Sequence, residues 1–263
     1  MPRRRRSLAS RADRHELYQA AVQQPEADVA FFERAFRTRY ARAPLSLRED
    51  FCGTGLVACA WAASRKERTA YGVDLDPEPL AWGALRNQQP LPESARARVQ
   101  LVQGDVRGVR LPKCEVIVAG NFSFCVFPTR PALLEYLRAA RRGLADEGML
   151  VLDVLGGSAT QRDETETTRR EKGFVYVWEH KRFDPISYRS QYAIHFRFPD
   201  GSELHDAFTY DWRMWTIPEL TELLEGAGFA SVDVFWEMGD VFRRVTRAPA
   251  DDCWLAELVA FVS

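Results

Sequence analysis

The sequence predicts an α/β fold in which a doubly wound, mostly parallel sheet carries an antiparallel β insertion and an N-terminal helical lid. Three patterns predict it. Between residues 45 and 155, apolar runs typical of buried strands alternate with helical segments, and the short links favour a parallel sheet with right-handed crossovers. Residues 172–212 then alternate with the two-residue period of antiparallel strands. Residues 1–44 instead show helical periodicity.

The N-terminal lid is expected over residues 1–44, ahead of one domain over residues 45–263 that holds the insertion at about 158–215. The run Arg3–Arg6 makes residues 1–9 a basic tail that is expected to be disordered. Apolar residues recur at helical spacing on both sides of Pro25. Helices are therefore expected over residues 13–24 and 28–39.

The parallel sheet is expected to take one strand from each buried apolar run of the alternating region. The helix over residues 56–64 follows a glycine turn. The next helix begins after Asp76, which can cap it, with Pro77 at the first helical position. An amphipathic helix over residues 131–142 ends at Gly143. The expected strands are residues 46–51, 69–75, 98–103, 115–119 and 148–155.

The alternation of strands and helices stops after residue 156. Residues 158–170 are polar and charged, and they are predicted to form a mobile loop. The antiparallel strands that follow are joined by turns containing Asp and Pro, and they are expected at residues 172–183, 188–198 and 202–212. Thr216 and Glu219 form a capping box for a helix over residues 219–225. The last strands are expected at residues 231–236 and 255–262.

The composition narrows the classes of function. Lys and Arg total 36 and Asp and Glu total 37, and this balance argues against a general nucleic-acid binder. No apolar run approaches the roughly 20 residues of a membrane helix, and the basic N-terminus lacks the apolar segment of a secretory signal. The five cysteines form no CxxC pair, which suits a reducing cytoplasm and gives no zinc-ligand spacing. We therefore expect a cytoplasmic protein with no bound metal.

Carboxylates stand at the ends of the first three predicted strands. Glu49 precedes a turn containing Gly53 and Gly55, where glycine lets the backbone approach a ligand and the following helix offers free N–H groups. Asp74 ends the second strand, where a ribose diol is bound in such sheets, and Asp105 ends the third. Because the carboxyl ends of parallel strands open on one crevice, the three acids are expected to converge on one ligand.

These motifs resemble those of class I S-adenosylmethionine-dependent methyltransferases over roughly residues 45–236. The resemblance implies a Rossmann-like seven-stranded sheet and S-adenosyl-L-methionine as the cofactor. It implies that Glu49 lies near the methionine amino group, that Asp74 binds the ribose and that Asp105 binds the adenine amine. Phe51 stands where the family commonly has Gly, and Glu49 stands where it commonly has Asp.

The same resemblance implies a wider cofactor site at the strand ends and on the first helix, which often folds over the cofactor in this family. The residues expected to bind the cofactor are Glu49, Cys52, Gly53, Gly55, Asp74, Leu75, Asp105, Val106, Asn121 and Tyr18.

In this family the segment after the fourth strand lies beside the sulfonium and the substrate. Here residues 120–124 lack the double proline of the enzymes that methylate adenine bases or glutamine. Methyl transfer from a sulfonium depends on in-line orientation, so no dedicated base is required and none is obvious. The catalytic residue stays open among side chains that could orient an acceptor or take its proton: Asn121, His195, Tyr210 and Arg213.

The sequence thus predicts an enzyme that transfers a methyl group to N or O of a small molecule. The antiparallel insertion and residues 215–220 resemble small-molecule enzymes of the glycine N-methyltransferase type. An RNA or protein methyltransferase that recruits its target through Arg3–Arg6 stays an alternative, as does a non-catalytic cofactor-binding partner protein. A dehydrogenase would need G-x-G-x-x-G after the first strand, and the chain lacks it. Binding to nucleic acid or to a membrane is not expected, and the oligomeric state stays open.

Overall fold

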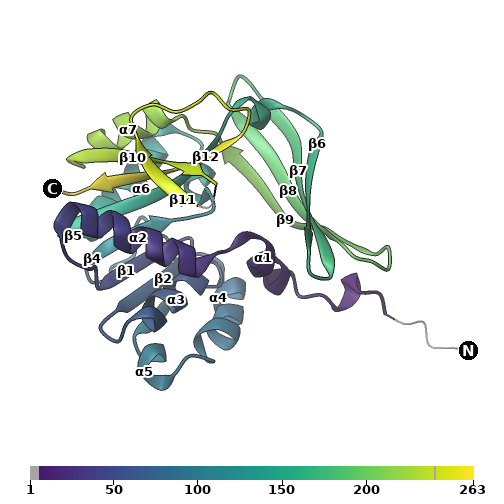
Figure 1. The fold of residues 1–263 in the computed structure, drawn as a ribbon, viewed down its shortest axis with the longest axis horizontal. Helices are drawn as coiled ribbons and strands as arrows, with labels where there is room; N and C mark the ends of the chain where they lie inside the picture. The colour runs from purple at the N-terminus through teal and green to yellow at the C-terminus, as the bar shows by residue number, and fades with distance from the viewer. Residues whose placement is uncertain (1–5, 240) are drawn as a thin grey trace, which may run out of the picture. The chain divides into compact units, whose positions relative to one another are not determined.

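The computed structural model describes residues 6–239 and 241–263. The chain divides into two compact units (Figure 1): unit 1 contains residues 1–24 and 157–214, and unit 2 contains residues 25–156 and 215–263. Arg3 to Arg5, which carry most of the predicted basic tail, lie outside the described residues. Across the part of the chain that the structure describes, no helix combines the length and apolar character that crossing a membrane requires.

Unit 2 holds a mixed sheet with strand order β11-β10-β12-β5-β4-β1-β2-β3. The strands from β5 to β3 pair in parallel, while β12, β10 and β11 are antiparallel to their neighbours. The sheet has eight strands, one more than predicted, because β11 returns beside β10 at the edge. The strands are β1 Ser46–Asp50, β2 Thr69–Asp74, β3 Val99–Gln103, β4 Cys114–Ala119, β5 Leu144–Gly156, β10 Ser231–Met238, β11 Val241–Val245 and β12 Trp254–Phe261.

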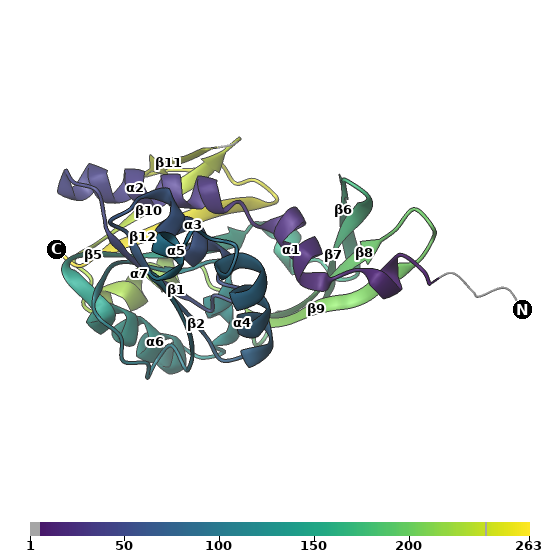
Figure 2. The same ribbon diagram turned by 90° about the horizontal axis from the view of Figure 1, so that it is seen from below.

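Helices cover both faces of this sheet, with α2 and α6 on opposite sides (Figure 2). The face under α2 and α3 is apolar: Phe32 and Phe36 of α2 and Trp61 of α3 share one buried cluster with Leu47 and Val151 of the strands. On the other face, α6 is amphipathic and buries its apolar side. The helices are α2 Pro25–Tyr40, α3 Leu56–Ser64, α4 Pro77–Gly83, the π-helical η2 Ala84–Gln88, α5 Glu93–Arg96, η3 Ser123–Val126, α6 Arg130–Gly143 and α7 Ile217–Gly226.

Local signals explain where these elements begin. Asp76 accepts a hydrogen bond from the backbone N–H of Glu78 and caps α4, as predicted. The capping box of Thr216 and Glu219 opens α7. The structure therefore confirms the doubly wound α/β fold and the sheet-forming segments of the sequence.

Unit 1 is a four-stranded antiparallel sheet with order β6-β7-β8-β9. Helix α1 packs on it: Tyr18 contacts Phe208 at 4.9 Å between ring centroids, and Ala21 joins the buried cluster around Phe196. The elements are η1 Ala9–Arg11, α1 Arg14–Val22, η4 Ser158–Gln161, β6 Thr165–Glu171, β7 Phe174–Asp184, β8 Arg189–Arg197 and β9 Glu203–Arg213.

The mobile loop predicted over residues 158–170 is wrong. This segment contains η4 and most of β6, which pairs with β7 along its length. Residues 165–170 are all exposed, because β6 is an edge strand whose side chains do not enter a core. An edge strand needs no apolar alternation, so its polar sequence concealed it.

Candidate cofactor site

The glycine turn lies between β1 and α3, as predicted. The N–H of Gly55 donates to the carbonyl oxygen of Cys52 at 2.8 Å, and Gly53 and Gly55 have φ angles of +53° and +64°. No heavy atom lies within 4 Å of where a Cβ on Gly53 would stand. The turn therefore presents an open strip of backbone beside the first turn of α3, whose N–H groups favour negative or polar ligand atoms.

Phe51 adopts the left-handed backbone conformation that the family commonly assigns to Gly, with φ +56°. For a bulky side chain this conformation is strained. Its ring packs against Phe127 and Tyr136, with centroids 6.0 Å and 5.4 Å away. Aromatic packing thus offsets the strain and keeps the turn in the shape that glycine adopts freely.

Asp74, at the end of β2, is tied to the turn. Its carboxylate accepts the N–H of Gly53 at 2.7 Å and the N–H of Asp76 at 2.9 Å. The next residue, Leu75, is a large apolar side chain that stays 65% exposed. A carboxylate beside an exposed apolar side chain can bind a ribose diol and one face of a base.

Glu49 is buried under the turn, where it accepts the N–H of Ala58 at 2.8 Å. Burial raises the pKa of Glu49 to about 8. Asp50 points to the opposite face, where it pairs with Arg48 at 2.8 Å and accepts the hydroxyl of Tyr136 at 3.1 Å. Of the two neighbouring acids, only Glu49 therefore lies under the turn.

Asp105 follows β3, and Arg107 holds its carboxylate through contacts of 2.6–3.2 Å. Hydrogen bonds from Arg107 lower the pKa of Asp105. The adenine amine predicted to bind Asp105 would have to share this carboxylate with a guanidinium. Val106 beside it is buried.

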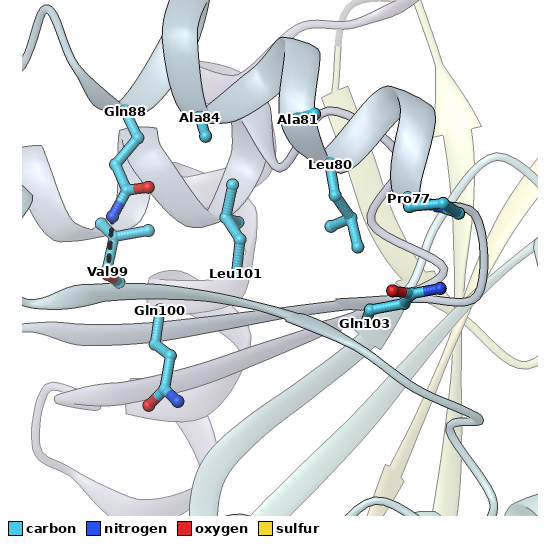
Figure 3. A pocket seen from close by; sticks show the side chains of 9 residues that line it. All are labelled: Pro77, Leu80, Ala81, Ala84, Gln88, Val99, Gln100, Leu101 and Gln103. Carbon is cyan, nitrogen blue, oxygen red and sulfur yellow. Dashed lines mark hydrogen bonds between the residues drawn. The ribbon is translucent and has the colours of Figure 1, made fainter.

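A groove of about 480 Å³ runs along β3 under α4 and η2 (Figure 3). Leu80, Leu101 and Gln103 are among the side chains that line it, and none of the predicted cofactor residues does. We therefore do not assign this groove to the cofactor.

After β4, Asn121 and Phe122 both have left-handed φ angles, +54° and +56°. The carboxylate of Asp153, on the neighbouring strand β5, accepts the N–H of Phe122 at 2.8 Å and also bonds the N–H of Asn121. Burial raises the pKa of Asp153 to about 7. Asp153 thus fixes the segment that follows the fourth strand, and the sequence prediction missed it.

The sequence prediction also missed two further carboxylates on the sheet face that α2 and α3 cover. Asp28 of α2 and Glu257 of β12 are electrostatically coupled to Asp153, and Asp28 is also coupled to Glu49. Burial raises the pKa of Asp28 to about 6, and burial together with Asp153 raises that of Glu257 well above its usual range. The sequence does carry a signal for Asp153. Met149, Val151 and Asp153 alternate on one strand face, so an acid occupies a position where an apolar residue is expected.

Among the candidate catalytic residues in unit 1, His195 uses both ring nitrogens in contacts within the sheet. Its Nδ1 accepts the N–H of Asp206 at 2.8 Å, and its Nε2 contacts Glu179 at 3.0 Å. His195, His205 and Asp206 lie close enough to share a metal ion. However, the Nδ1 lone pair is already used, and Lys181 contacts Asp206 at 2.6 Å. This arrangement favours neither a free base nor a metal site.

Tyr18, Tyr210 and Arg213 also lie in unit 1. Tyr18 shares a hydrogen bond with Tyr210, and burial raises the pKa of Tyr210 well above its usual value, so Tyr210 is a poor base. Arg213 donates to the carbonyl of Met214 and lies 5.4 Å from the ring centroid of Tyr188. In unit 2 the structure brings together Glu49, Cys52, Gly53, Gly55 and Asp74 at the turn. Asn121 follows β4, the strand that pairs with β1.

These residues fit S-adenosylmethionine. The open backbone over Gly53 leaves room for a ligand, and exposed Leu75 offers an apolar surface beside Asp74. Burial raises the pKa values of Glu49 and Asp153, and a positive charge beside them would favour their ionised forms. This cofactor carries a sulfonium and an ammonium group.

Comparisons with known proteins bear on the fold and on the domain that holds these residues. Residues 50–152 match the family model described as a methyltransferase domain. No curated protein sequence matches the chain significantly. Among solved structures, an S-adenosylmethionine-dependent methyltransferase from Clostridium acetobutylicum has a TM-score of 0.70 at 14% identity, over 94% of this chain and 96% of that one.

Two other solved structures carry descriptions of their acceptors. An amino pentose methyltransferase from Micromonospora echinaspora, bound to S-adenosylmethionine, has a TM-score of 0.68 at 18% identity, over 95% of this chain and 96% of that one. A sugar N-methyltransferase from a Streptoalloteichus species has a TM-score of 0.64 at 18% identity, over 93% of this chain and 92% of that one. Residues 50–152 thus match a methyltransferase domain, and the chain has the fold of S-adenosylmethionine-dependent methyltransferases.

Proposed function

We propose that this protein is an S-adenosylmethionine-dependent methyltransferase that transfers a methyl group to the nitrogen of a small-molecule amine, and that amino sugars are its class of acceptor. The observation that carries the proposal is the extent of the likeness to the amino pentose and sugar N-methyltransferases, which covers 95% and 93% of this chain. The likeness therefore includes the antiparallel unit 1 as well as the matched domain over residues 50–152.

In this proposal Asp74 binds the ribose hydroxyls, Leu75 contacts the adenine and the turn at Gly53 and Gly55 lies under the nucleoside. Glu49 holds the turn from below, and the methionine ammonium group near it favours its ionised form. Bound S-adenosylmethionine supplies a methyl carbon made electrophilic by the sulfonium. The chain has to hold the acceptor nitrogen in line with that carbon and exclude water, which can contribute roughly 7–11 kcal/mol.

The remaining predicted contacts belong to the same proposal: Cys52, Asp105, Val106 and Asn121 at the strand ends, and Tyr18 on the N-terminal lid. The described cysteines are all unpaired. Unpaired cysteines support a reducing compartment, so we also propose that the protein works in the cytoplasm.

The test is a comparison of matched acceptors. The protein is incubated with S-adenosylmethionine and either glucosamine or glucose, and mass spectrometry measures S-adenosylhomocysteine and the methylated product. We expect N-methylated glucosamine and no methylated glucose. Transfer to the hydroxyls alone, or transfer to RNA with steep loss of binding at higher salt, would contradict the amine proposal.

A further inference from the structure

Four acidic side chains share the α2/α3 face of the sheet in unit 2. Strand pairing aligns Asp153 of β5 directly with Glu257 of β12. Paired residues point to the same face, with Cβ atoms about 4.5–5.5 Å apart. The next residue of the same face on β12 is Val259, which is buried in the cluster with Val151. The two carboxylates thus continue an apolar stripe at the edge where β4 and β5 end.

The third carboxylate belongs to Asp28 of α2, the helix that covers this face of the sheet. Phe31 of α2 contacts Phe235 at 5.3 Å between centroids, and Phe235 is the strand partner of Glu257. Asp28 lies three residues before Phe31, on the same side of the helix. Glu49 completes the group, because Asp28 is coupled to it as well as to Asp153 and Glu257.

Among the residues that the structure describes, no cation pairs with these acids. Within residues 6–239 and 241–263, Glu257 and Asp28 receive no hydrogen bond, and neither they nor Asp153 form an ion pair. The carboxylates of Asp153 and Glu257 keep some contact with solvent, although protein surrounds them. Two ionised carboxylates directly opposite each other destabilise a sheet, so ionising both members of this pair costs stability unless a positive group binds to it.

We infer that Asp153 and Glu257 bind the ammonium group of the methyl acceptor and take its proton. The inference deepens the proposed function and rests on it. Asp153 also bonds the backbone N–H groups of Asn121 and Phe122, and Asn121 is one of the residues proposed above to contact the cofactor. In this inference Asp153 therefore contacts both the acceptor amine and the segment proposed to border the cofactor.

A proton passes from the R–NH₃⁺ group to one carboxylate of the pair, which leaves a lone pair on nitrogen. That lone pair forms the N–C bond to the methyl carbon as the C–S bond breaks, and its electrons stay on sulfur. The product leaves as the ammonium ion R–NH₂⁺–CH₃, and the carboxyl group returns its proton to solvent.

A binding experiment tests the pair without any acceptor. Sinefungin carries an amino group on carbon where S-adenosylmethionine carries its methyl on sulfur, and S-adenosylhomocysteine has neither. Calorimetry measures both dissociation constants for the wild type and for the variant Asp153→Asn with Glu257→Gln. We expect the preference for sinefungin to fall by about tenfold or more in the variant, because charge-assisted hydrogen bonds are lost.

Asp146→Asn with Glu147→Gln is the matched control, since it removes two carboxylates from the opposite end of β5, where Asp146 is fully exposed. We expect it to leave both dissociation constants within about twofold. Affinity for S-adenosylhomocysteine also reports on folding, because a misfolded variant would lose it. An unchanged sinefungin preference in a variant that still binds S-adenosylhomocysteine would overturn the inference.

Turnover separates the inference from the proposed function. If wild type methylates glucosamine, the Asp153 and Glu257 variant should lose about 100-fold in kcat/KM. Equal kcat/KM values for variant and wild type would also reject the pair. If wild type binds S-adenosylhomocysteine but methylates no amine, the amine proposal fails, and the sinefungin ratio still decides whether the carboxylates face an ammonium group.

Discussion

At the scale of single residues, the backbone conformation of Phe51 predicts that glycine is the better small substitute at this position. Its φ of +56° favours Gly. We therefore expect Phe51→Gly to be more stable than Phe51→Ala, by about 1 kcal/mol, although both lose the ring contacts with Phe127 and Tyr136. Thermal unfolding measures the difference.

Phe127 is the matched control for Phe51, because its ring also lies on Tyr136, at 5.3 Å, while its φ is −81°. There the order should reverse, with Phe127→Gly less stable than Phe127→Ala by about 0.5–1 kcal/mol. The same order at both positions would show that packing alone, and not backbone conformation, sets the residue at the turn.

Asp74 and Asp76 are two carboxylates two residues apart with different roles. Asp74 accepts the turn N–H of Gly53, whereas Asp76 caps α4. We expect Asp74→Ala to weaken S-adenosylhomocysteine binding about 10- to 100-fold, through the loss of ribose hydrogen bonds. Calorimetry measures the affinity.

The control Asp76→Ala should lower stability by about 1 kcal/mol through the lost cap and change the affinity little. Equal affinity in Asp74→Ala and wild type would remove Asp74 from the ribose site. A larger loss of affinity in Asp76→Ala would move the ribose contact to that residue.

At the scale of elements, the acidic face predicts how stability depends on pH. The pKa of Asp153 is raised to about 7 and that of Glu49 to about 8. The folded protein therefore binds more protons than the unfolded chain between about pH 4 and pH 8, and stability falls as pH rises through this range. We expect the unfolding free energy to drop by on the order of 2 kcal/mol from pH 5 to pH 8.

Urea unfolding at the two pH values measures that slope. Asp153→Asn with Glu257→Gln should flatten it and raise stability at pH 8, because the repulsion between β5 and β12 is removed. A slope equal to that of the wild type would mean that other groups set the pH dependence.

Sequence patterns predicted most elements because apolar periodicity and caps are local. Strands β6 and β11 were missed for one reason: both are edge strands, where polar side chains such as Arg169 and Arg243 meet solvent and no alternation is needed. The turn at Gly53 and Gly55 was predicted because its chemistry is local too. Asp28, on a helix, could not be joined to Glu257, because only the fold brings residues so distant in sequence to one face.

At the scale of the whole molecule, the division into two units predicts where ligand binding protects the backbone. All the predicted cofactor residues except Tyr18 lie in unit 2. Hydrogen exchange with and without S-adenosylhomocysteine should therefore slow at the turn after β1, at the end of β2 and at residues 120–123, because binding stabilises the regions that it contacts. The core of unit 1, around Phe196, should exchange at the same rate in both states. Slower exchange of α1 in addition to these unit 2 segments would support the lid role proposed for Tyr18, whereas slowing confined to unit 1 would contradict the assignment of the cofactor to the turn.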